Sequence, residues 1–237
     1  MRISYYVLSQ MAKCPKQYEL DLSQEVSTTS APLFLGSTFH LIQKLYFSTR
    51  IAGTELSLPD LLDAFNTYWT AETGADGRPI MWEKNKPDEQ AELGRALIKA
   101  YYPYTQRIQP LLIEHKLTKD VGGHTVSGII DLLTTSGSVV DYKTSAWIPY
   151  KTDIEREYQP TVYSFLLGGS VDFQYHYIIK QKLPVVRIFP TKRNGKDLQF
   201  FEKVLLPNVI RMIQSGVFPP LGVVTGQCQR CSYKCNE

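Results

Sequence analysis

The chain has 237 residues, of which 43% are hydrophobic and 21% charged, with 15 glycines and 14 prolines. This composition excludes collagen-like, coiled-coil and largely disordered proteins, and no apolar run approaches the roughly 20 residues of a membrane-spanning helix. A formal net charge of +3 is too small to indicate a nucleic-acid partner by itself. The opening residues, MRISYYVLSQMAK, contain no apolar stretch followed by a cleavage site, so we expect a cytoplasmic protein without membrane contact.

Apolar residues at helical spacing predict helices in the first half of the chain. The predicted helices cover 4–20 with a break at Cys14-Pro15, 31–50, 58–72 and 88–107, and a polar loop covers 73–87. We therefore expect residues 50–110 to form a helical subdomain.

Strand patterns dominate the second half of the chain. The predicted strands cover 111–119, 124–134, 138–143, 173–181, 185–189 and 198–201, the last after a hairpin turn at Asn194-Gly195, with helices over 153–167 and 205–214. This order predicts an α/β (α+β) fold in a single domain, 1–237, with a mixed central sheet flanked by helices.

One hairpin of this sheet carries the most informative residues. A three-residue loop centred on Ser136 would place Asp131 directly opposite Asp141. Two unpaired carboxylates facing each other across a ladder are destabilising, and a divalent cation such as Mg²⁺ or Mn²⁺ between them removes the repulsion. Because strand side chains alternate, Asp141 and Lys143 share a face and Tyr142 points the other way.

Two carboxylates and an ammonium group at one spot suit phosphodiester hydrolysis. A metal ion there would bind a phosphate oxygen and lower the pKa of its water, and Lys143 would orient the water or neutralise developing charge. The simpler interpretation is a solvent-facing hairpin in which Lys143 bridges the two aspartates. The pattern alone leaves both interpretations open.

Four cysteines lie near the two ends of the chain: Cys14, and then Cys228, Cys231 and Cys235. In a cytosolic chain this grouping favours metal ligation over disulfides. Cys14 would complete the set only if the first residues fold back onto the last ones. The alternative is three loose thiols near the end and one buried, structural Cys14.

Asp131 with Asp141-Tyr142-Lys143 resembles the core motif of the PD-(D/E)XK nucleases. Further matches resemble the RecB-type exonuclease branch, including the AddB nuclease domain and the CRISPR-associated exonucleases of spacer acquisition. These matches are a histidine motif, Gly36-Ser-Thr-Phe-His40; a Gln-x-x-x-Tyr motif, Gln159-Pro-Thr-Val-Tyr163; and the cysteine pattern of the subset with an iron–sulfur staple, Cys14-Pro15 with the three later cysteines. The resemblance spans essentially the whole chain in the family's order.

The resemblance implies a restriction-endonuclease-like core and a role for each matched residue. A Mg²⁺ or Mn²⁺ ion would be held by His40, Asp131, Asp141 and the backbone carbonyl of Tyr142. Lys143 would be the catalytic lysine, with Gln159 and Tyr163 positioning it or contacting the scissile phosphate. Glu114, on the neighbouring strand, is expected to be structural.

The resemblance also implies a 4Fe–4S cluster that joins the two ends of the chain through Cys14 and residues 228–235. Cys235 follows Cys231 after three residues, whereas the family usually has five. This shorter spacing makes a zinc ion the alternative occupant.

The implied function is that of a metal-dependent deoxyribonuclease, an exonuclease acting on single-stranded or frayed DNA ends. The first alternative is a non-catalytic module that binds DNA ends for a helicase, recombinase or integrase, and the second is a sequence-specific endonuclease. Phage recombination, CRISPR adaptation and repair all remain open as contexts, as does the oligomeric state. The candidates for stacking on bases are aromatic residues: Tyr5, Tyr6, Tyr101, Tyr102, Tyr104 and Trp147.

Overall fold

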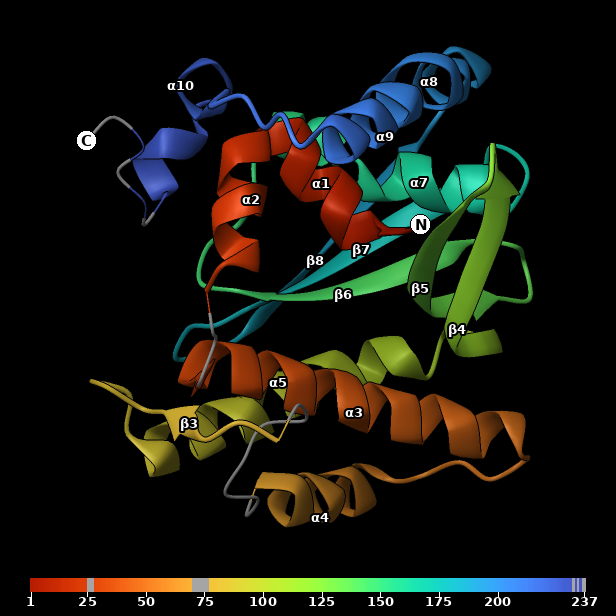
Figure 1. Ribbon diagram of the computed structural model, residues 1–237. Coiled ribbons are helices and arrows are strands. Elements are labelled where there is room, and N and C mark those ends of the chain that lie inside the picture. Colours follow the sequence, from red (N-terminus) through yellow and green to blue (C-terminus); the bar gives the residue numbers. More distant parts are fainter. Residues whose placement is uncertain (25–27, 70–76, 232, 234, 236–237) are drawn as a thin grey trace.

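The computed structural model describes residues 1–24, 28–69, 77–231, 233 and 235, and it is built around a six-stranded mixed sheet (Figure 1). The strands of this sheet are β1 (Arg2–Ser4), β4 (Pro110–Val121), β5 (His124–Thr134), β6 (Val139–Ser145), β7 (Asp172–Ile179) and β8 (Val185–Lys192). Their order is β1-β5-β6-β7-β8, with β4 also paired to β5. Because β1 with β5 and β6 with β7 are parallel and the other pairs antiparallel, the predicted mixed sheet is confirmed.

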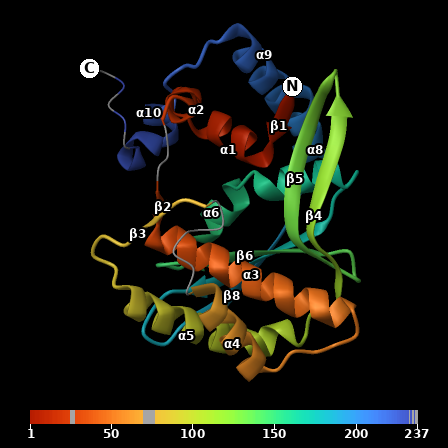
Figure 2. The ribbon, with the colours of Figure 1, turned by 60° about the horizontal axis from the view of Figure 1, so that its bottom comes forward.

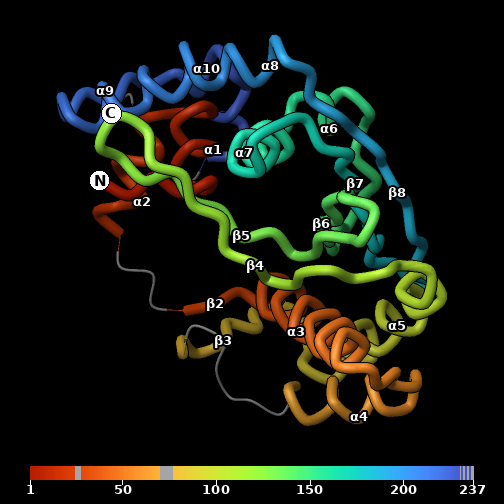
Figure 3. The backbone as a smooth tube through the Cα atoms, turned by 90° about the vertical axis from the view of Figure 1, so that its right-hand side faces the viewer, coloured from red at the N-terminus to blue at the C-terminus, as the bar shows by residue number. Residues whose placement is uncertain are grey.

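Helices cover both faces of the sheet, as the views in Figures 1 and 3 show. The helices are α1 (Tyr5–Lys13), α2 (Pro15–Leu22), α3 (Ala31–Ile51), α4 (Leu58–Trp69), α5 (Pro87–Thr105), α6 (Lys151–Arg156), α7 (Gln159–Leu166), α8 (Gly195–Phe200), α9 (Leu206–Ser215) and α10 (Gly222–Thr225). A π-helical turn, η1 (Phe201–Leu205), joins α8 to α9, and a 3-10 turn, η2 (Gln227–Arg230), follows α10. A separate two-stranded sheet pairs β2 (Thr29–Ser30) with β3 (Ile80–Met81). None of the helices in the described part of the chain is long and apolar enough to span a membrane.

Each face of the sheet has its own hydrophobic core. On one face, α3, α4 and α5 pack around buried Phe39, Phe47, Tyr101 and Tyr142. On the other face, α1, α7 and α9 pack against residues that include Phe173. The strand in the middle, β6, therefore presents alternate side chains to two separate cores, as its predicted alternation requires.

Most of the elements expected from periodicity are present, and one prediction is wrong. The expected strand over 198–201 is part of the helical segment α8–η1, because Asn194 caps a helix here and makes no hairpin turn. Its side chain accepts hydrogen bonds from the backbone N–H groups of Lys196 and Asp197, and the Asp197 carboxylate accepts one from the Asn194 N–H. This reciprocal arrangement is a capping box, which stabilises a helix start.

Smaller differences concern where elements begin and end. The helix expected over 153–167 is two helices, α6 and α7, separated at Glu157 and Tyr158. Strand β1 was not predicted, because three residues are too few for a periodic signal. The parts of the expected helix and loop that fall on residues 70–76 lie outside the described residues.

The last described residues dock on the first two helices. The Thr225 hydroxyl donates to the Lys13 carbonyl (2.7 Å), and the Gln227 amide donates to Gln17 (3.0 Å). The Tyr233 hydroxyl donates to the carboxylate of Asp21 (2.8 Å). Figure 1 shows α10 beside α2 accordingly.

Candidate functional site

The candidate site lies where β5 and β6 separate. The hairpin loop is centred on Ser136 as expected, and the register pairs Leu133 with Val139 and Leu132 with Val140. The next two residues in this register, Asp131 and Asp141, are not paired in the ladder. Instead, the backbone N–H of Tyr142 donates to Oδ2 of Asp131 at 2.9 Å. The Asp131 carboxylate therefore occupies the opening between the strands.

Helix α3 carries His40 to this opening. Figure 2 shows this helix running across β6. The helix crosses close to β6 at Gly36, where an added Cβ would lie 3.3 Å from the Thr144 hydroxyl. His40 follows one helical turn later on the same helix face. Its Nε2 lies 3.0 Å from the carbonyl oxygen of Tyr142 and its Nδ1 lies 3.5 Å from Oδ2 of Asp131. Burial lowers the pKa of His40, which favours the neutral imidazole that metals bind.

Glu114 completes a three-residue group with His40 and Asp131. One nitrogen or oxygen atom from each of these side chains lies within 4.8 Å of the other two. The β4–β5 ladder runs from Ile113–Leu132 to His115–Ile130, which places Glu114 opposite Asp131. Sequence reasoning gave Glu114 only a structural role. The available signal was a carboxylate on the strand adjacent to Asp131.

The backbone of Glu114 is strained at this position. Its φ of 46° lies in the left-handed region, which non-glycine residues inside strands rarely adopt. Such a conformation costs on the order of 1–3 kcal/mol and persists where the surrounding structure enforces it. The distortion interrupts the regular alternation of β4 at Glu114, where the Glu114 carboxylate joins the group with His40 and Asp131.

Asp141 lies beside this group but contacts other partners. Its side chain is 2% exposed, and its Oδ2 lies 2.7 Å from Nζ of Lys143. The side-chain amide of Gln159 donates to its Oδ1. Asp141 and Lys143 share a sheet face, while Tyr142 points into the opposite core, as alternation predicted.

The charges at the opening are strongly coupled. Burial and the neighbouring Asp141 raise the pKa of Asp131 well above its usual value. The pKa of Lys143 is raised as well, because attraction to Asp141 and Asp131 outweighs the opposing effect of its burial. Lys143 therefore stays protonated and balances part of the negative charge.

These donors fit a hard divalent cation. Carboxylate and carbonyl oxygens with one imidazole nitrogen are the ligands that Mg²⁺ and Mn²⁺ take in proteins. In addition, Oδ2 of Asp141 is buried and accepts no hydrogen bond of ordinary geometry besides its ion pair with Lys143. An oxygen in this state has capacity left for a cation.

Gln159 and Tyr163 lie on one face of α7 but contact different partners. Gln159 contacts Asp141, whereas the Tyr163 hydroxyl donates to the backbone carbonyl of Ile129 at 2.5 Å. That carbonyl lies on β5 between the stretches paired with β1 and with β6, where the strand edge is open. A Cβ on Gly128 would lie 2.5 Å from the Tyr163 ring, so the tyrosine packs directly on the glycine. Tyr163 therefore closes a gap in the sheet.

The four cysteines lie together at the docked ends of the chain, and all are free thiols. A Cβ on Gly222 would lie 2.7 Å from Sγ of Cys228 and 3.5 Å from Sγ of Cys14. The pKa of Cys235 is raised by desolvation and then by the charges of Cys231, Cys14 and Cys228. The structure thus brings the first and last residues together, as the cysteine pattern required.

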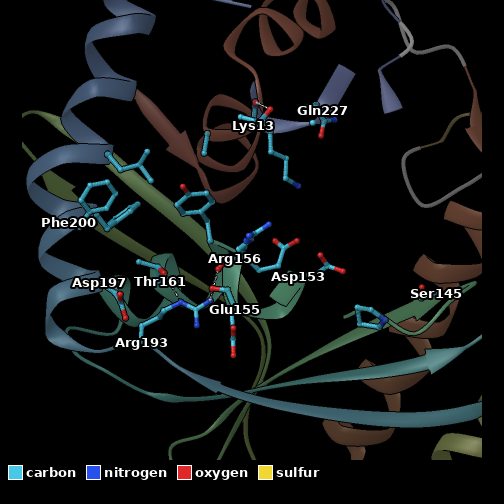
Figure 4. Close-up of a pocket in the computed structure, with 18 of the residues that line it drawn as sticks. Lys13, Ser145, Asp153, Glu155, Arg156, Thr161, Arg193, Asp197, Phe200 and Gln227 are labelled. Atoms are coloured by element: carbon cyan, nitrogen blue, oxygen red, sulfur yellow. Dashed lines mark hydrogen bonds between the residues drawn. The ribbon is translucent and has the colours of Figure 1, made fainter. Parts of the chain in front are cut away.

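A cavity of about 900 Å³ lies between α1, α6, α8 and the segment that follows α10 (Figure 4). Two of its lining residues adjoin the site: Ser145 is two residues beyond Lys143, and Tyr177 is the partner of Lys143 on β7. The remaining lining carries both acidic and basic side chains. Lys143 itself and the group of His40, Glu114 and Asp131 are not among the residues that line this cavity.

Comparison with known proteins gives one family. The model of the PD-(D/E)XK nuclease superfamily matches residues 2–235. No curated protein sequence matches the chain. A crystal structure from Eubacterium rectale, described as a candidate exonuclease, covers 100% of this chain and 90% of its own at 17% identity, with a TM-score of 0.61. A structure named SSO0001 covers 87% of this chain and 84% of its own at 14% identity, but its TM-score of 0.34 is too low to support a shared fold.

Proposed function

The chain belongs to the PD-(D/E)XK nuclease superfamily, and from this premise we propose that it is a metal-dependent deoxyribonuclease. The observation that carries the proposal is the convergence of His40, Glu114 and Asp131 within 4.8 Å, beside the ion pair of Asp141 and Lys143. The β5–β6 ladder ends before Asp131 and Asp141, so the two strands separate at this group of side chains. A purely structural hairpin has no need for this concentration of buried charge.

Each side chain has a role in this proposal. His40, Asp131 and Glu114 would hold the divalent ion, with Oδ2 of Asp141 and the carbonyl of Tyr142 as further oxygen ligands. When bound, the ion supplies a Lewis acid that polarises the phosphate and makes water a stronger nucleophile near neutral pH. Neutral His40 leaves a ring nitrogen free for ligation.

Asp141 and Lys143 act together on the other side of the opening. Asp141 fixes Lys143, whose ammonium group offsets the charge that develops on the phosphate in the transition state. Gln159 in turn fixes Asp141 through its side-chain amide. Preorganised charges of this kind supply a large share of catalysis because they need no rearrangement during the reaction.

We further propose exonuclease action on single-stranded or frayed ends. Two observations support this choice: the structural neighbour described as a candidate exonuclease, and the cavity lined by Ser145 and Tyr177, which adjoin Lys143 on β6 and β7.

A 4Fe–4S cluster held by Cys14, Cys228, Cys231 and Cys235 is part of the proposal. The support is the position of the thiols: a Cβ on Gly222 would lie within 3.5 Å of the Sγ atoms of both Cys14 and Cys228, and all four cysteines are free. The resemblance to the iron–sulfur subset favours the cluster, with zinc as the alternative occupant. Four unbridged cysteines also suit a reducing compartment such as the cytoplasm.

The test is a cleavage time course on single-stranded DNA labelled at either end, with Mn²⁺, Mg²⁺ or a chelator. Lys143→Ala should abolish metal-dependent shortening, and the labelled end reports polarity. Lys99→Ala, which removes an exposed lysine from α5, is the matched control and should cleave like the wild type. Binding to ends without any cleavage would instead indicate the non-catalytic module that delivers ends to a helicase, recombinase or integrase.

A further inference from the structure

A second, smaller pocket of about 360 Å³ lies along β5 next to the candidate site. Ile129 lines this pocket and lies two residues before Asp131 on the same face of the strand, a separation of about 7 Å. Lys116 is the partner of Ile129 on β4, and Arg2 belongs to β1 on the opposite edge of β5. The pocket is therefore bounded by three strands and begins about one nucleotide step from the metal ligands.

The charge of this pocket is uniformly positive. Arg2 and Lys116 are its only charged lining residues, and both side chains are exposed. No hydrogen bond or ion pair with another described residue engages either side chain. By contrast, the larger cavity includes Asp153, Glu155 and further carboxylates in its lining. A guanidinium and an ammonium group without acidic neighbours in the pocket are suited to a phosphate.

The walls of the pocket offer apolar surface for a base. Tyr6 is 54% exposed and Ile129 is 51% exposed, and both side chains line the pocket. Aromatic rings beside cationic groups stack on unpaired bases without regard to sequence. Tyr5 connects this pocket to the site, because its ring packs on Tyr163 (5.9 Å between centroids) and its hydroxyl is within electrostatic reach of Lys143.

We propose that this pocket binds the nucleotide adjacent to the bond that is cut, with Arg2 and Lys116 on its phosphate and Tyr6 with Ile129 on its base. The inference rests on the proposed function and adds the substrate position that the metal ligands do not supply. Single-stranded DNA is the ligand, because a base must be unpaired to lie against Tyr6. The phosphate is either the terminal one or an internal one, and the chemistry of the pocket is the same for both.

The experiment measures binding separately from cleavage. Anisotropy of a fluorescein-labelled oligothymidylate is recorded in chelator, where no metal-dependent cleavage occurs, over a series of salt concentrations. Arg2→Ala/Lys116→Ala should weaken binding about tenfold and make the salt slope less negative by about 0.7 for each phosphate that the protein no longer neutralises. Arg107→Ala/Lys99→Ala removes the same charge from exposed positions outside the pocket and should change both values much less.

A second pair of variants tests the base contact. Tyr6→Ala should weaken binding about tenfold, whereas Tyr6→Phe should bind like the wild type because it keeps the ring. Substrates with a 5′-phosphate, with a 5′-hydroxyl and without ends distinguish the source of the phosphate. A defect confined to the 5′-phosphorylated strand identifies a terminal phosphate, and an equal defect on all three identifies an internal one.

The outcomes separate this inference from the proposed function. If the wild type cleaves DNA and the Arg2→Ala/Lys116→Ala variant binds it as tightly as the wild type does, the pocket proposal is overturned and the nuclease proposal is supported. An equal loss in the Arg107→Ala/Lys99→Ala control also overturns it, because the effect would then be one of net charge. If the wild type cleaves nothing but its binding depends on Arg2 and Lys116, the pocket proposal is supported and the nuclease proposal is overturned. Thermal unfolding of each variant shows that the fold is retained.

Discussion

Asp131 and Asp141 are the next pair in the register of β5 and β6, but their carboxylates serve different partners. Asp131 accepts the backbone N–H of Tyr142 and lies with His40, whereas Asp141 holds Lys143 at 2.7 Å. At the opening of the hairpin Asp131 joins the group with His40 and Glu114, and Asp141 beside it also fixes Lys143. The predicted trio of His40, Asp131 and Asp141 is thus close in space, but Glu114 is the third member of the tightest group.

Asp141→Asn should lower the rate of cleavage by about 100-fold or more, because the amide no longer fixes the ammonium group of Lys143. Its size is unchanged, so the fold should survive. The measurement is a single-turnover rate with saturating Mn²⁺. Asp172→Asn, which breaks an exposed ion pair with Lys192, is the control and should leave the rate unchanged. Full activity in Asp141→Asn would place the reaction elsewhere.

Glu114 offers a test of metal binding that does not depend on catalysis. Glu114→Gln should weaken Mn²⁺ binding at least tenfold in the absence of DNA, because a charged oxygen ligand is lost. Titration followed by electron paramagnetic resonance measures this directly. Glu89→Gln, which removes a carboxylate from an exposed pair with Lys86, should bind Mn²⁺ normally.

Glu114→Gly separates the backbone strain from the ligand. Glycine adopts a φ of 46° without a penalty, so this variant should gain on the order of 1 kcal/mol in free energy of unfolding in metal-free buffer. It should also lose Mn²⁺ affinity as Glu114→Gln does. Chemical denaturation measures the first effect, and a variant less stable than the wild type would show that relief of backbone strain does not control stability at this position.

Sequence patterns were sufficient for the part of the site that depends on regular geometry. The loop centred on Ser136 fixed the hairpin register, and strand alternation placed Asp141 and Lys143 on one face. The spacing of Gly36 and His40 suits a helix that approaches β6 closely and presents an imidazole one turn later. The register and the shared face of Asp141 and Lys143 follow from the periods of strands, which are local properties of the chain, whereas His40 was identified only by its resemblance to the family's histidine motif.

The features that were missed depend on irregular geometry or on ambiguous local signals. Glu114 joins the site only because its backbone departs from strand conformation, which no period reveals. Asn194-Gly195 is favourable both in a hairpin turn and at a helix start. The carboxylate of Asp197 accepts a hydrogen bond from the Asn194 N–H, which stabilises the helix start. The contact of the Tyr163 hydroxyl with the Ile129 carbonyl depends on an open strand edge that exists only after β1 and β6 have paired with β5, and the proposed role of Tyr163 beside Lys143 stays a prediction.

Gly128→Ala should destabilise the protein by about 1–3 kcal/mol, because the new methyl group would overlap the Tyr163 ring. Gly169→Ala is the control, since no atom lies within 4 Å of its added Cβ. Urea denaturation at fixed metal concentration compares the two. Equal stability of both variants would show that α7 moves freely away from β5.

His176 should make the stability of the fold depend on pH. Burial lowers its pKa to about 4, and its Nδ1 lies 2.6 Å from the Tyr101 hydroxyl. The unfolded histidine has a pKa near 6.5. Between about pH 4 and pH 6.5, His176 is therefore protonated in the unfolded chain and neutral in the folded chain. The contribution of neutral His176 to the free energy of unfolding is fully present above about pH 6.5. It is lost as pH falls towards 4, by about 3 kcal/mol in total.

His176→Gln should flatten the pH dependence of the unfolding free energy between about pH 4 and pH 6.5. The exposed His115 provides the control, and His115→Gln should keep the wild-type slope. Denaturation curves at half-unit steps of pH in a chelating buffer measure both. A wild-type slope in His176→Gln would assign the effect to other groups.

The proposed iron–sulfur cluster should make the stability of the whole chain depend on one buried residue, Cys14. Cys14→Ser should remove the visible absorbance of an anaerobically purified protein, reduce its iron content and lower its melting temperature, because Cys14 links the first helices to the segment around Cys228. The hydrogen bonds of Thr225, Gln227 and Tyr233 to the first two helices also join these segments, so part of the contact should survive the loss of Cys14. Ser9→Ala, at a buried position on α1 outside the cysteine set, should keep the iron. A colourless wild type with one zinc ion per chain would overturn the iron–sulfur cluster and leave a zinc staple in its place.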